Sequence, residues 1–448
     1  MAEQATRETF GSKFGMLMTL VGVSVGLGNV WRFPYMAGKF GGAAFVLVYV
    51  VLLFVVGIPG LIAEYHLGRY TRKGTLGAFE KAGFPAGKVV GTWFWIVVTF
   101  AVGYYSNVIG WVLFYAVREI GVAFGATINA AAILPPDSGF NAQSFFLQFF
   151  FTAVVIFSCA IVLVKGLKNG IEKASVVIMP AFYILFLILI IRSVTLPGAG
   201  AGIKWYIGDF RWKELSGGSI AAALGQVIFS LSLGGTFMVV YGSYLKKDAN
   251  LISTGIMNGI GDTVAALMAG FAIFPAVFAF NIEPSSGPGL IFFTLPKVFD
   301  SMAFGWLFAI FFYAALFGAA YLSAIAAFEV MIAGVVDNTK LNRKQATWLM
   351  AGVGFLFAIP PMINMGIFGP WDLFWGSGMQ TLGGVIAVVA SVWVIKRSEG
   401  LKDIAEGTGK AFPLWLYWWM RIAVPICVGF VGVNWLLQEV FKINIFGG

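Results

Sequence analysis

The feature that most constrains the fold of this sequence is the recurrence of apolar runs long enough to cross a lipid bilayer. A helix of about 20 apolar residues spans the hydrocarbon core. Eleven such runs are predicted along the 448 residues, at approximately 12–38, 41–69, 88–120, 145–164, 172–194, 218–246, 251–281, 304–336, 345–364, 372–396 and 413–440. Because they leave no room for a separate soluble domain, residues 1–448 are predicted to form one all-α integral membrane domain.

Charged residues are scarce and unevenly placed. They make up 11% of the chain, whereas soluble domains contain roughly a quarter. The net charge of +9 comes from lysines and arginines that cluster after the second, fourth, sixth, eighth and tenth runs. Since positive loops stay in the cytoplasm, the N-terminus is predicted to be cytoplasmic and the C-terminus external, in a bacterial-type inner membrane. The charge therefore indicates membrane topology and not nucleic-acid binding.

Other residue types argue against several classes of site. Cys159 and Cys427 both fall inside predicted spans, so a disulfide framework is not expected. His66, the one histidine, lies near a cytoplasmic helix end, where a surface or packing role is expected rather than a metal site. No P-loop is present, which argues against an ATP-driven pump. Neither enzymatic activity nor a cleavable signal at the N-terminus is expected.

Two short stretches place small and polar residues in the middle of apolar runs. They are SVGLGN at 24–29 in the first run and SLSLGG at 230–235 in the sixth. Two halves of five helices would lie in opposite orientations, and paired glycine interruptions are typical of transporters with inverted repeats. We therefore predict one repeat at about 12–194, a second at about 218–396 and an extra span at about 413–440, with the first and sixth spans unwound at mid-membrane.

Unwound turns inside a membrane need a physical reason. Freed backbone N–H and C=O groups are costly unless something binds them. Helix N-termini suit a carboxylate, and freed carbonyls suit a small cation such as sodium. Tight helix packing through small residues is the alternative interpretation. The polar side chains of Asn29, Ser230 and Ser232 beside the glycines favour a binding site.

Longer motifs around these stretches resemble those of a known family. They are GLGNVWRFPY at 26–35, KFGGAAFVLVY at 39–49, IPGLIAEYHLGRY at 58–70, GQVIFSLSLGG at 225–235 and GPGLIFFTLPKVF at 287–299. They resemble the neurotransmitter:sodium symporter family, particularly its bacterial amino-acid transporters, which have a leucine-transporter-type fold. The resemblance implies two inverted five-helix repeats, with substrate and two sodium ions bound midway through the membrane.

The resemblance also implies ligands for the two sodium ions. Those of site 1 are the carbonyl of Ser24 and the side chains of Asn29, Ser230 and Asp262. Those of site 2 are the carbonyls of Gly22, Val25 and Ala319 and the hydroxyl of Ser323. Site 2 departs from the family pattern, because Leu322 stands where members usually carry Thr, Ser or Asp. Sodium needs several oxygen ligands, so this site is either weaker, hydrated or lost.

The substrate residues implied by the resemblance surround the two interruptions. They are Ser24, Gly26, Gly28, Ala101, Tyr105, Phe229, Ser230, Ser232, Gly235, Ser323 and Ala327. The substrate carboxylate would meet sodium, the backbone at 26–28 and the Tyr105 hydroxyl. Its ammonium would meet carbonyls and Ser232, and Phe229 would close over the pocket. An aromatic amino acid is predicted because small residues stand where leucine-preferring relatives hold bulky ones, namely at Ala101, Gly235 and Ala327.

Four charged residues resemble the gates of the family. Arg32 and Asp372 correspond to its extracellular pair. Arg7 and Asp337 correspond to its cytoplasmic pair, with Phe10 where members usually have tryptophan. A charge that adjoins a broken membrane helix is rarely without function.

Four further residues in or near the spans carry weaker expectations. Gly170 and Pro180 resemble a motif that lets the start of the fifth span unwind. Glu64 is expected to bond freed backbone nearby, and Glu329 is given no role.

Together these features predict a sodium-coupled symporter of hydrophobic, preferentially aromatic, L-amino acids that works by alternating access. Its predicted partners are the amino acid and the lipid bilayer. Asp262 would supply a fixed negative charge beside the first sodium, so chloride is not expected to be required. The alternative is an amino-acid sensor or scaffold that keeps the fold without transport, which Leu322 mildly supports. Charges at both gates favour the transporter, since a sensor needs no alternating access.

Overall fold

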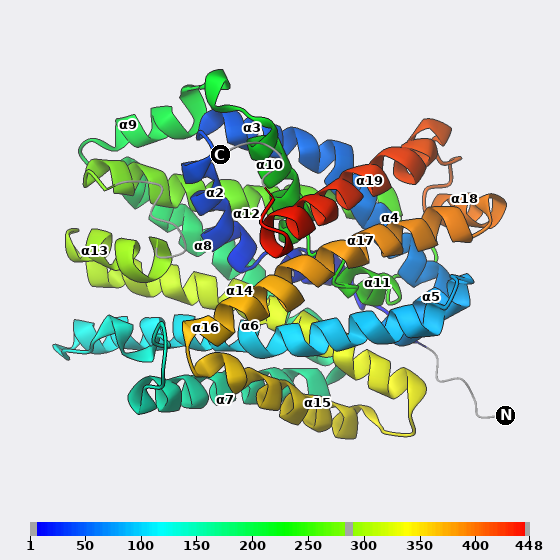
Figure 1. Cartoon of the computed structure of the whole chain (residues 1–448), viewed down its shortest axis with the longest axis horizontal. Coiled ribbons are helices and arrows are strands. Elements are labelled where there is room, and N and C mark those ends of the chain that lie inside the picture. Colours follow the sequence, from blue (N-terminus) through cyan, green and yellow to red (C-terminus); the bar gives the residue numbers. More distant parts are fainter. Residues whose placement is uncertain (1–6, 283–289, 444–448) are drawn as a thin grey trace.

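The chain folds as an all-helical bundle (Figure 1). The computed structural model describes residues 7–282 and 290–443, and no β-strand occurs among them. The predicted all-α membrane fold is therefore confirmed. The motif at 287–299 begins outside the described residues and is followed only from position 290 onward.

The α-helices follow one another with short connections. Those of the first part of the chain are α1 (Lys13–Ser24), α2 (Phe33–Lys39), α3 (Ala43–Leu52), α4 (Ile58–Thr71), α5 (Thr75–Ala82), α6 (Gly87–Ala123), α7 (Ala142–Val164), α8 (Lys173–Val194) and α9 (Ala199–Ile203). Those of the second part are α10 (Gly217–Ser230), α11 (Phe237–Gly242), α12 (Leu251–Ala279), α13 (Leu295–Asp300), α14 (Gly305–Asn338), α15 (Arg343–Ala358), α16 (Met365–Trp371), α17 (Met379–Val389), α18 (Arg397–Glu406) and α19 (Leu414–Trp435).

Shorter turns extend or join these helices. The π-helical ones are η1 (Gly28–Arg32), η2 (Leu53–Gly57), η4 (Leu167–Glu172), η5 (Lys204–Gly208), η7 (Leu290–Thr294), η9 (Asp372–Gly378), η10 (Ala390–Val394) and η11 (Leu436–Val440). The 3₁₀ turns are η3 (Ala130–Ile133), η6 (Trp212–Glu214) and η8 (Pro360–Met362). Gly170 lies in η4 and Pro180 inside α8, so the start of the fifth span is a π-helical turn in this structure.

The described residues contain nine helical segments long and apolar enough to cross a membrane, or ten if one bent pair counts as a span. The bent pair joins Lys13–Ser24 to Gly28–Lys39 at 54°. The predicted span 218–246 is not one helix, because it is divided between α10, of 14 residues, and α11, of 6 residues. Each piece is too short to cross ~30 Å by itself. This part of the eleven-span prediction is met only by two short helices.

Both interruptions contain residues that favour a break. α1 ends at Ser24, and the helix resumes at Gly28. Between α10 and α11 the backbone is left-handed at Ser232 (φ 54°), Gly234 (φ 92°) and Thr236 (φ 58°). Glycine adopts such a conformation freely, whereas it is strained for a β-branched threonine. The structure thus breaks both helices at the predicted stretches, and the depth of the breaks in a bilayer stays a prediction.

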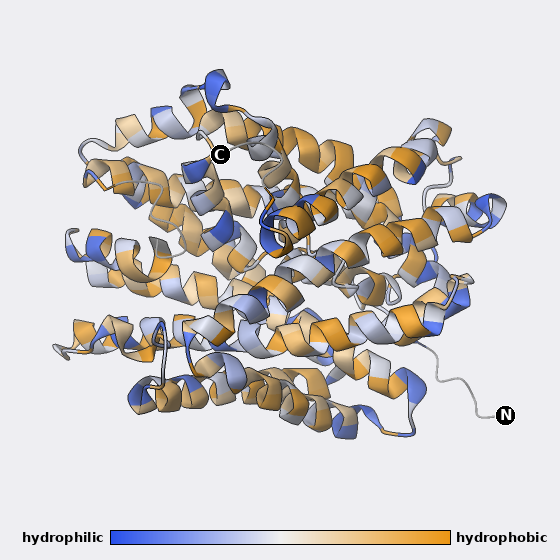
Figure 2. Cartoon of the chain, viewed as in Figure 1, coloured by the Kyte–Doolittle hydropathy of each residue, from blue (hydrophilic) through white to orange (hydrophobic). Residues whose placement is uncertain are grey.

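The centre of the bundle is α14. The apolar window of this helix is 89% buried, whereas that of the segment Leu414–Val440, which contains α19, is 22% buried. α14 packs against α6, α8 and α15. Figure 2 shows apolar residues along most of each helix, with hydrophilic ones mainly at the ends and near the middle of the bundle. The peripheral helices therefore present apolar side chains outward, as expected for a multi-pass membrane protein.

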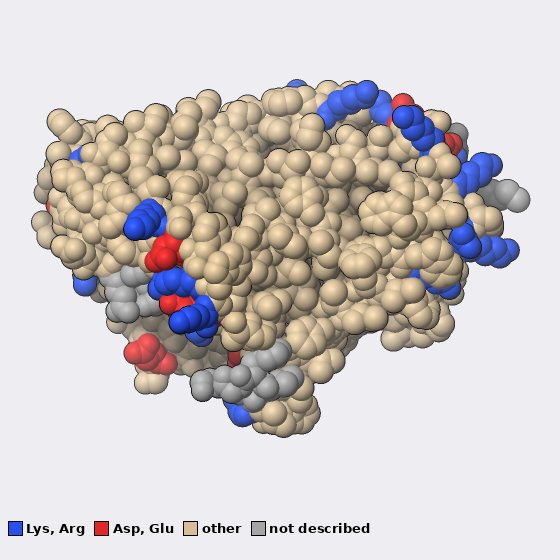
Figure 3. Space-filling model, turned by 90° about the horizontal axis from the view of Figure 1, so that it is seen from above, with Lys and Arg blue, Asp and Glu red and all other residues tan. Residues whose placement is uncertain are grey.

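Basic side chains gather at one end of the molecule. Figure 3 shows Lys and Arg at its right-hand end, where α5 and α18 lie in Figure 1. At the left-hand end, acidic and basic side chains lie close together. This asymmetry agrees with the positive-inside rule, and the cytoplasmic position of the α5–α18 end stays a prediction.

Candidate functional site

The two interrupted helices meet inside the bundle. The Ser232 hydroxyl donates to the carbonyl of Val23 (3.1 Å). Gln226 Nε2 donates to the carbonyl of Gly28 (2.9 Å). Side chains of α10 and of the second interruption therefore satisfy backbone carbonyls at the first interruption.

Asp262 of α12 joins this meeting point with a fully buried carboxylate. Its Oδ1 accepts from Asn29 Nδ2 (2.7 Å), and its Oδ2 accepts from the hydroxyls of Ser230 (2.8 Å) and Tyr49 (3.3 Å). No Lys, Arg or His pairs with this carboxylate in the part of the chain that the structure describes. A buried carboxylate without a positive partner is costly, so a cation at this place would be stabilising.

The neighbouring groups supply further oxygens. Asn29 Oδ1 accepts from the N–H of Gly26 (3.0 Å), and its Nδ2 also donates to the backbone carbonyl of Asp262 (2.9 Å). The Ser24 hydroxyl accepts from Asn258 Nδ2 (3.1 Å). The structure brings together three of the residues predicted for sodium site 1, namely Asn29, Ser230 and Asp262, whereas the hydroxyl of the fourth, Ser24, is bonded to Asn258. Their donor set consists of oxygens, which suits a hard cation.

The residues predicted for sodium site 2 form a different environment. The Ser323 hydroxyl contacts the carbonyls of Val25 (3.2 Å) and Ala319 (3.4 Å) as a donor. Leu322 is buried, and its Cδ1 lies 2.7 Å from where a methyl group on Gly22 would stand. α14 therefore packs a hydrocarbon side chain directly against α1. These residues offer a sodium ion one side-chain oxygen beside backbone carbonyls, and a leucine takes the adjoining space where a second side-chain oxygen would stand.

A cavity of ≈ 70 Å³ lies beside the interruptions. The predicted substrate residues that line it are Ser24, Gly26, Gly28, Ala101, Tyr105, Phe229, Ser232, Ser323 and Ala327. Further lining residues include Val98, Val102, Tyr104 and Phe237. The cavity thus combines hydroxyl and backbone groups with apolar walls, a combination that suits a small amphipathic molecule.

The surroundings of Gly235 differ from expectation. Gly235 does not line this cavity, although its small size was expected to enlarge the substrate pocket. A methyl group on Gly235 would collide with the ring of Phe237, which lines the cavity instead. Phe237 is not among the predicted substrate residues, because the resemblance to the family points to position 235. The available signal was an aromatic residue two positions further along the same interruption.

A second cavity, of ≈ 750 Å³, adjoins the first. Phe229 and Gln380 line both cavities. The guanidinium of Arg32 lies over the Phe229 ring, with Cζ 4.6 Å from the ring centroid. The expected direct pair of Arg32 with Asp372 is not among the ion pairs within residues 7–282 and 290–443. Asp372 instead lies beside the Tyr104 hydroxyl, both being close to where a methyl group on Gly376 would stand, so the outer pair is not in direct contact.

The other predicted gate pair is closed. Arg7 and Asp337 form an ion pair of 2.5 Å. Arg7 Nε also donates to the Ser243 hydroxyl (3.0 Å), and the guanidinium lies over the ring of Tyr244 (4.7 Å). Phe10 is buried and packs edge-on against the same tyrosine. These contacts hold the N-terminal segment against α11 and α14 on one side of the site, while the cavity beyond Phe229 leaves the other side hollow.

Two buried glutamates of the spans have clear partners. Glu64 Oε1 accepts from the N–H of Gly234 (2.8 Å), the contact with freed backbone that was expected for it. Glu329 forms an ion pair of 2.6 Å with Arg343 and accepts from the Tyr244 hydroxyl. No pairing for Glu329 could be predicted from the sequence, because its partner lies on the next helix, beyond a turn.

The turn before α8 also holds the N-terminal segment. Glu172 accepts from the N–H groups of Gly11 (2.7 Å) and Ser12 (3.0 Å) and from the Ser12 hydroxyl (2.8 Å). In return, Glu8 accepts from the N–H of Leu167 (2.8 Å). Two carboxylates therefore link the first span to the start of the fifth, a pairing that no local sequence pattern indicated.

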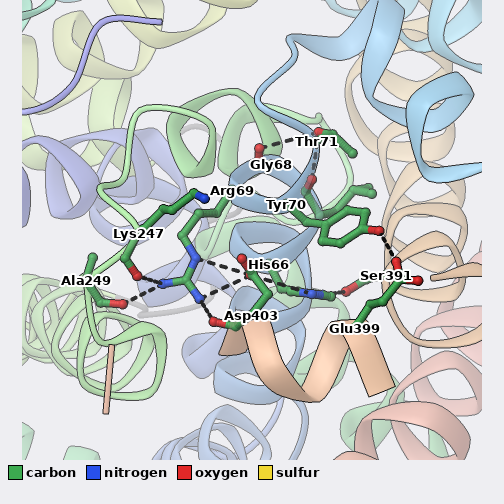
Figure 4. A network of polar contacts seen from close by, with 11 residues as sticks. His66, Gly68, Arg69, Tyr70, Thr71, Lys247, Ala249, Ser391, Glu399 and Asp403 are labelled. Carbon is green, nitrogen blue, oxygen red and sulfur yellow. Dashed lines mark hydrogen bonds and ion pairs between the residues drawn. The ribbon is translucent and has the colours of Figure 1, made fainter. Parts of the chain in front are cut away.

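His66 and Arg69 of α4 belong to a polar network near α18 (Figure 4). Arg69 donates to Asp403 Oδ2 (3.2 Å) and to the carbonyl of Ala249 (2.6 Å). His66 Nδ1 lies 2.8 Å from the Ser391 hydroxyl. Burial raises the pKa of Asp403, and the charge of Arg69 opposes that rise. His66 is buried in this network, which is a packing role.

Comparisons with known proteins agree on one family. The "Sodium:neurotransmitter symporter family" pattern matches residues 7–125 and 143–443. The sodium-dependent transporter YhdH of Bacillus subtilis is 33% identical, over 97% of this chain and 98% of that protein. The sodium-dependent serotonin transporter of Drosophila melanogaster is 26% identical, over 94% of this chain and 75% of that protein. The crystal structure of MhsT in complex with L-phenylalanine matches with a TM-score of 0.84 and 32% identity, over 96% of this chain and 99% of that one.

Proposed function

The chain belongs to the sodium:neurotransmitter symporter family, and from this premise we propose that it couples sodium entry to the uptake of hydrophobic, preferentially aromatic, L-amino acids. Its relatives are transporters rather than enzymes. The observation that carries the proposal is the buried carboxylate of Asp262, which lacks a cationic partner in the described residues and lies where two interrupted helices meet.

One sodium ion is proposed at site 1. Ser24, Asn29, Ser230 and Asp262 would hold it, and it would supply the positive charge that the carboxylate lacks. Three of these residues lie on the interruptions and the fourth on α12. Binding at this place therefore favours one mutual arrangement of the interrupted helices and α12.

Chloride independence follows from the same carboxylate. A cation beside a zwitterionic substrate in a low-dielectric interior needs a compensating negative charge. Asp262 provides a fixed one, fully buried and hydrogen-bonded on both oxygens. No anion is then needed to balance the site.

The cavity beside the interruptions is the proposed substrate site. The carboxylate of the amino acid would meet the N–H groups at 26–28 and the hydroxyl of Tyr105. That hydroxyl lies 2.9 Å from where a methyl group on Gly26 would stand, so glycine leaves the backbone accessible there. Ala101 and Ala327 would face the side chain. MhsT, of similar sequence and fold, is described in complex with L-phenylalanine, which supports a hydrophobic substrate.

Alternating access is supported by the unequal state of the two gate pairs. Arg7 and Asp337 are in contact, whereas Arg32 and Asp372 form no direct ion pair in the part of the chain that the structure describes, and a cavity of ≈ 750 Å³ lies beside Arg32. We propose that the open side faces outward and that the N-terminus is cytoplasmic, in a bacterial-type inner membrane. The site would then be reached from outside in this state.

A sensor or scaffold without transport is the second candidate. The observation that favours it is the packing of Leu322 against α1 at Gly22, because a missing ion site reduces the driving force for uptake. The contact between Arg7 and Asp337 favours the transporter, since a sensor has no need of a breakable pair behind its ligand.

Proteoliposomes test the proposal directly. Purified protein would be given tritiated L-tryptophan or L-leucine under an inward sodium, potassium or proton gradient. Accumulation is expected with sodium alone. Binding without accumulation would favour the sensor, and equal uptake in sodium and choline would refute sodium coupling.

A further inference from the structure

The ring of Phe237 lies where a side chain at position 235 would stand if that residue were not glycine. Gly235 has no side chain, and a methyl group placed there would collide with this ring. Phe237 is only half-buried, although its neighbours Thr236 and Met238 are fully buried. Because Phe237 also lines the cavity of ≈ 70 Å³, the accessible part of its ring faces that cavity.

The backbone conformation just before Phe237 constrains the position of its ring. Phe237 is the first residue of α11, preceded by Thr236 in a left-handed conformation with φ 58°. The Thr236 hydroxyl is 2.7 Å from that of Thr75 on α5, and both threonines are fully buried. The direction of the Phe237 side chain is therefore set by a strained residue that is anchored to another helix.

The cavity is small for an aromatic side chain while the ring stays in place. A cavity of ~150 Å³ takes up benzene, and the volume beside Phe237 is ≈ 70 Å³. A whole amino acid therefore needs more room than the cavity offers, and one with an aromatic side chain needs the most. The wall that can yield is a side chain rather than backbone.

Phe237 is better able to yield than the other phenylalanine of the cavity. Phe229 lies under the guanidinium of Arg32. Within residues 7–282 and 290–443, Phe237 stacks on no ring and lies under no cation. Turning the Phe237 ring would break van der Waals contacts, but no ring-stacking or cation–π contact.

We propose that Phe237 is the specificity-determining wall of the substrate pocket, in place of a side chain at Gly235. A small displacement of its ring makes room for an aliphatic side chain. An aromatic substrate is accepted only when the ring turns away. This inference depends on the proposed function and names the residue by which that same site selects size.

Competition binding in sodium chloride tests the inference. Tritiated L-leucine would be the probe, with unlabelled leucine, phenylalanine and tryptophan as competitors. Phe237→Ala should shift the ratio of tryptophan to leucine affinity towards tryptophan by about tenfold or more, since apolar pockets discriminate by that order per methylene group. Gly235→Ala should shift it several-fold the other way, because the added methyl pushes the ring into the cavity.

The double variant separates this role from a general loss of structure. In the Phe237→Ala background, Gly235→Ala has no ring to displace and should change the ratio less than twofold. Gly352→Ala is the matched control, because no atom lies within 4 Å of the added methyl. Equal weakening of all competitors by Phe237→Ala, or additive effects in the double variant, would overturn the inference. Absence of sodium-dependent leucine binding in the unmodified protein would instead overturn the proposed function.

Discussion

Asn29 Nδ2 lies 2.7 Å from Oδ1 of Asp262, so an interrupted helix is bonded directly to an uninterrupted one. Asn29 belongs to η1, which follows the break after α1, and Asp262 lies in the middle of α12. Both side chains are fully buried. A change in the charge of Asp262 is therefore felt at the interruption itself, which makes this residue the first target for testing.

Asp262→Asn should lower the affinity for sodium by about tenfold or more, equivalent to ~1.4 kcal/mol. The reason is that the substitution removes the only formal charge among the four residues proposed to hold the ion. Sodium-22 binding to purified protein measures this. Asp248→Asn, at an exposed position, is the control, and an unchanged affinity in Asp262→Asn would exclude site 1.

Replacement of chloride by gluconate should leave transport by the unmodified protein unchanged, because Asp262 already supplies the negative charge. In Asp262→Asn the same replacement should reduce the remaining uptake, since the charge must then come from the solution. Uptake of labelled amino acid in the two salts measures both. A strong chloride requirement in the unmodified protein contradicts the proposal.

Leu322→Thr should add a sodium site, because the hydroxyl would join Ser323 and the nearby carbonyls. The Hill coefficient for sodium is expected near one in the unmodified protein and above one in the variant. Leu322→Val has nearly the same shape as threonine without the oxygen, and it should stay near one. Two tightly bound sodium ions per unmodified protein would show that carbonyls or water suffice.

Glu172→Gln should free the N-terminal segment, because the amide retains one acceptor oxygen where the carboxylate accepts from Gly11 and Ser12. Hydrogen bonds to a charged group contribute ~1.5–3 kcal/mol, so local opening should increase about tenfold. Thr19→Cys places a thiol at a buried position of α1. The rate at which a water-soluble thiol reagent modifies it, in a background without the two native cysteines, measures the local opening. Glu80→Gln, exposed on α5, should have no effect.

The sequence predicted the parts of the site that depend on local pattern. Glycine and serine at 24–29 and 230–235 indicated the breaks, because their helix propensities are lower than those of alanine and leucine. The sequence did not indicate that Arg32 would lie over Phe229. Whether the charged residues of a gate are in contact depends on the relative position of helices and not on composition. The place of Phe237 in the cavity wall was not predicted for a related reason, because a left-handed turn at Thr236 redirects the side chain that follows.

The division of the sixth span into α10 and α11 also has a consequence for how the protein is made. Pieces of 14 and 6 residues are too short to be recognised as a membrane segment by length alone. The turn between them exposes polar groups that lipid cannot satisfy. Glu64, which accepts from the N–H of Gly234, is already synthesised at that stage, whereas Asp262, which accepts from the Ser230 hydroxyl, is not. Stable burial of these two short helices therefore has to wait for α12. In a nascent chain arrested at residue 250, whose earlier spans are already in the membrane, a cysteine introduced by Ser232→Cys should still react with a water-soluble thiol reagent.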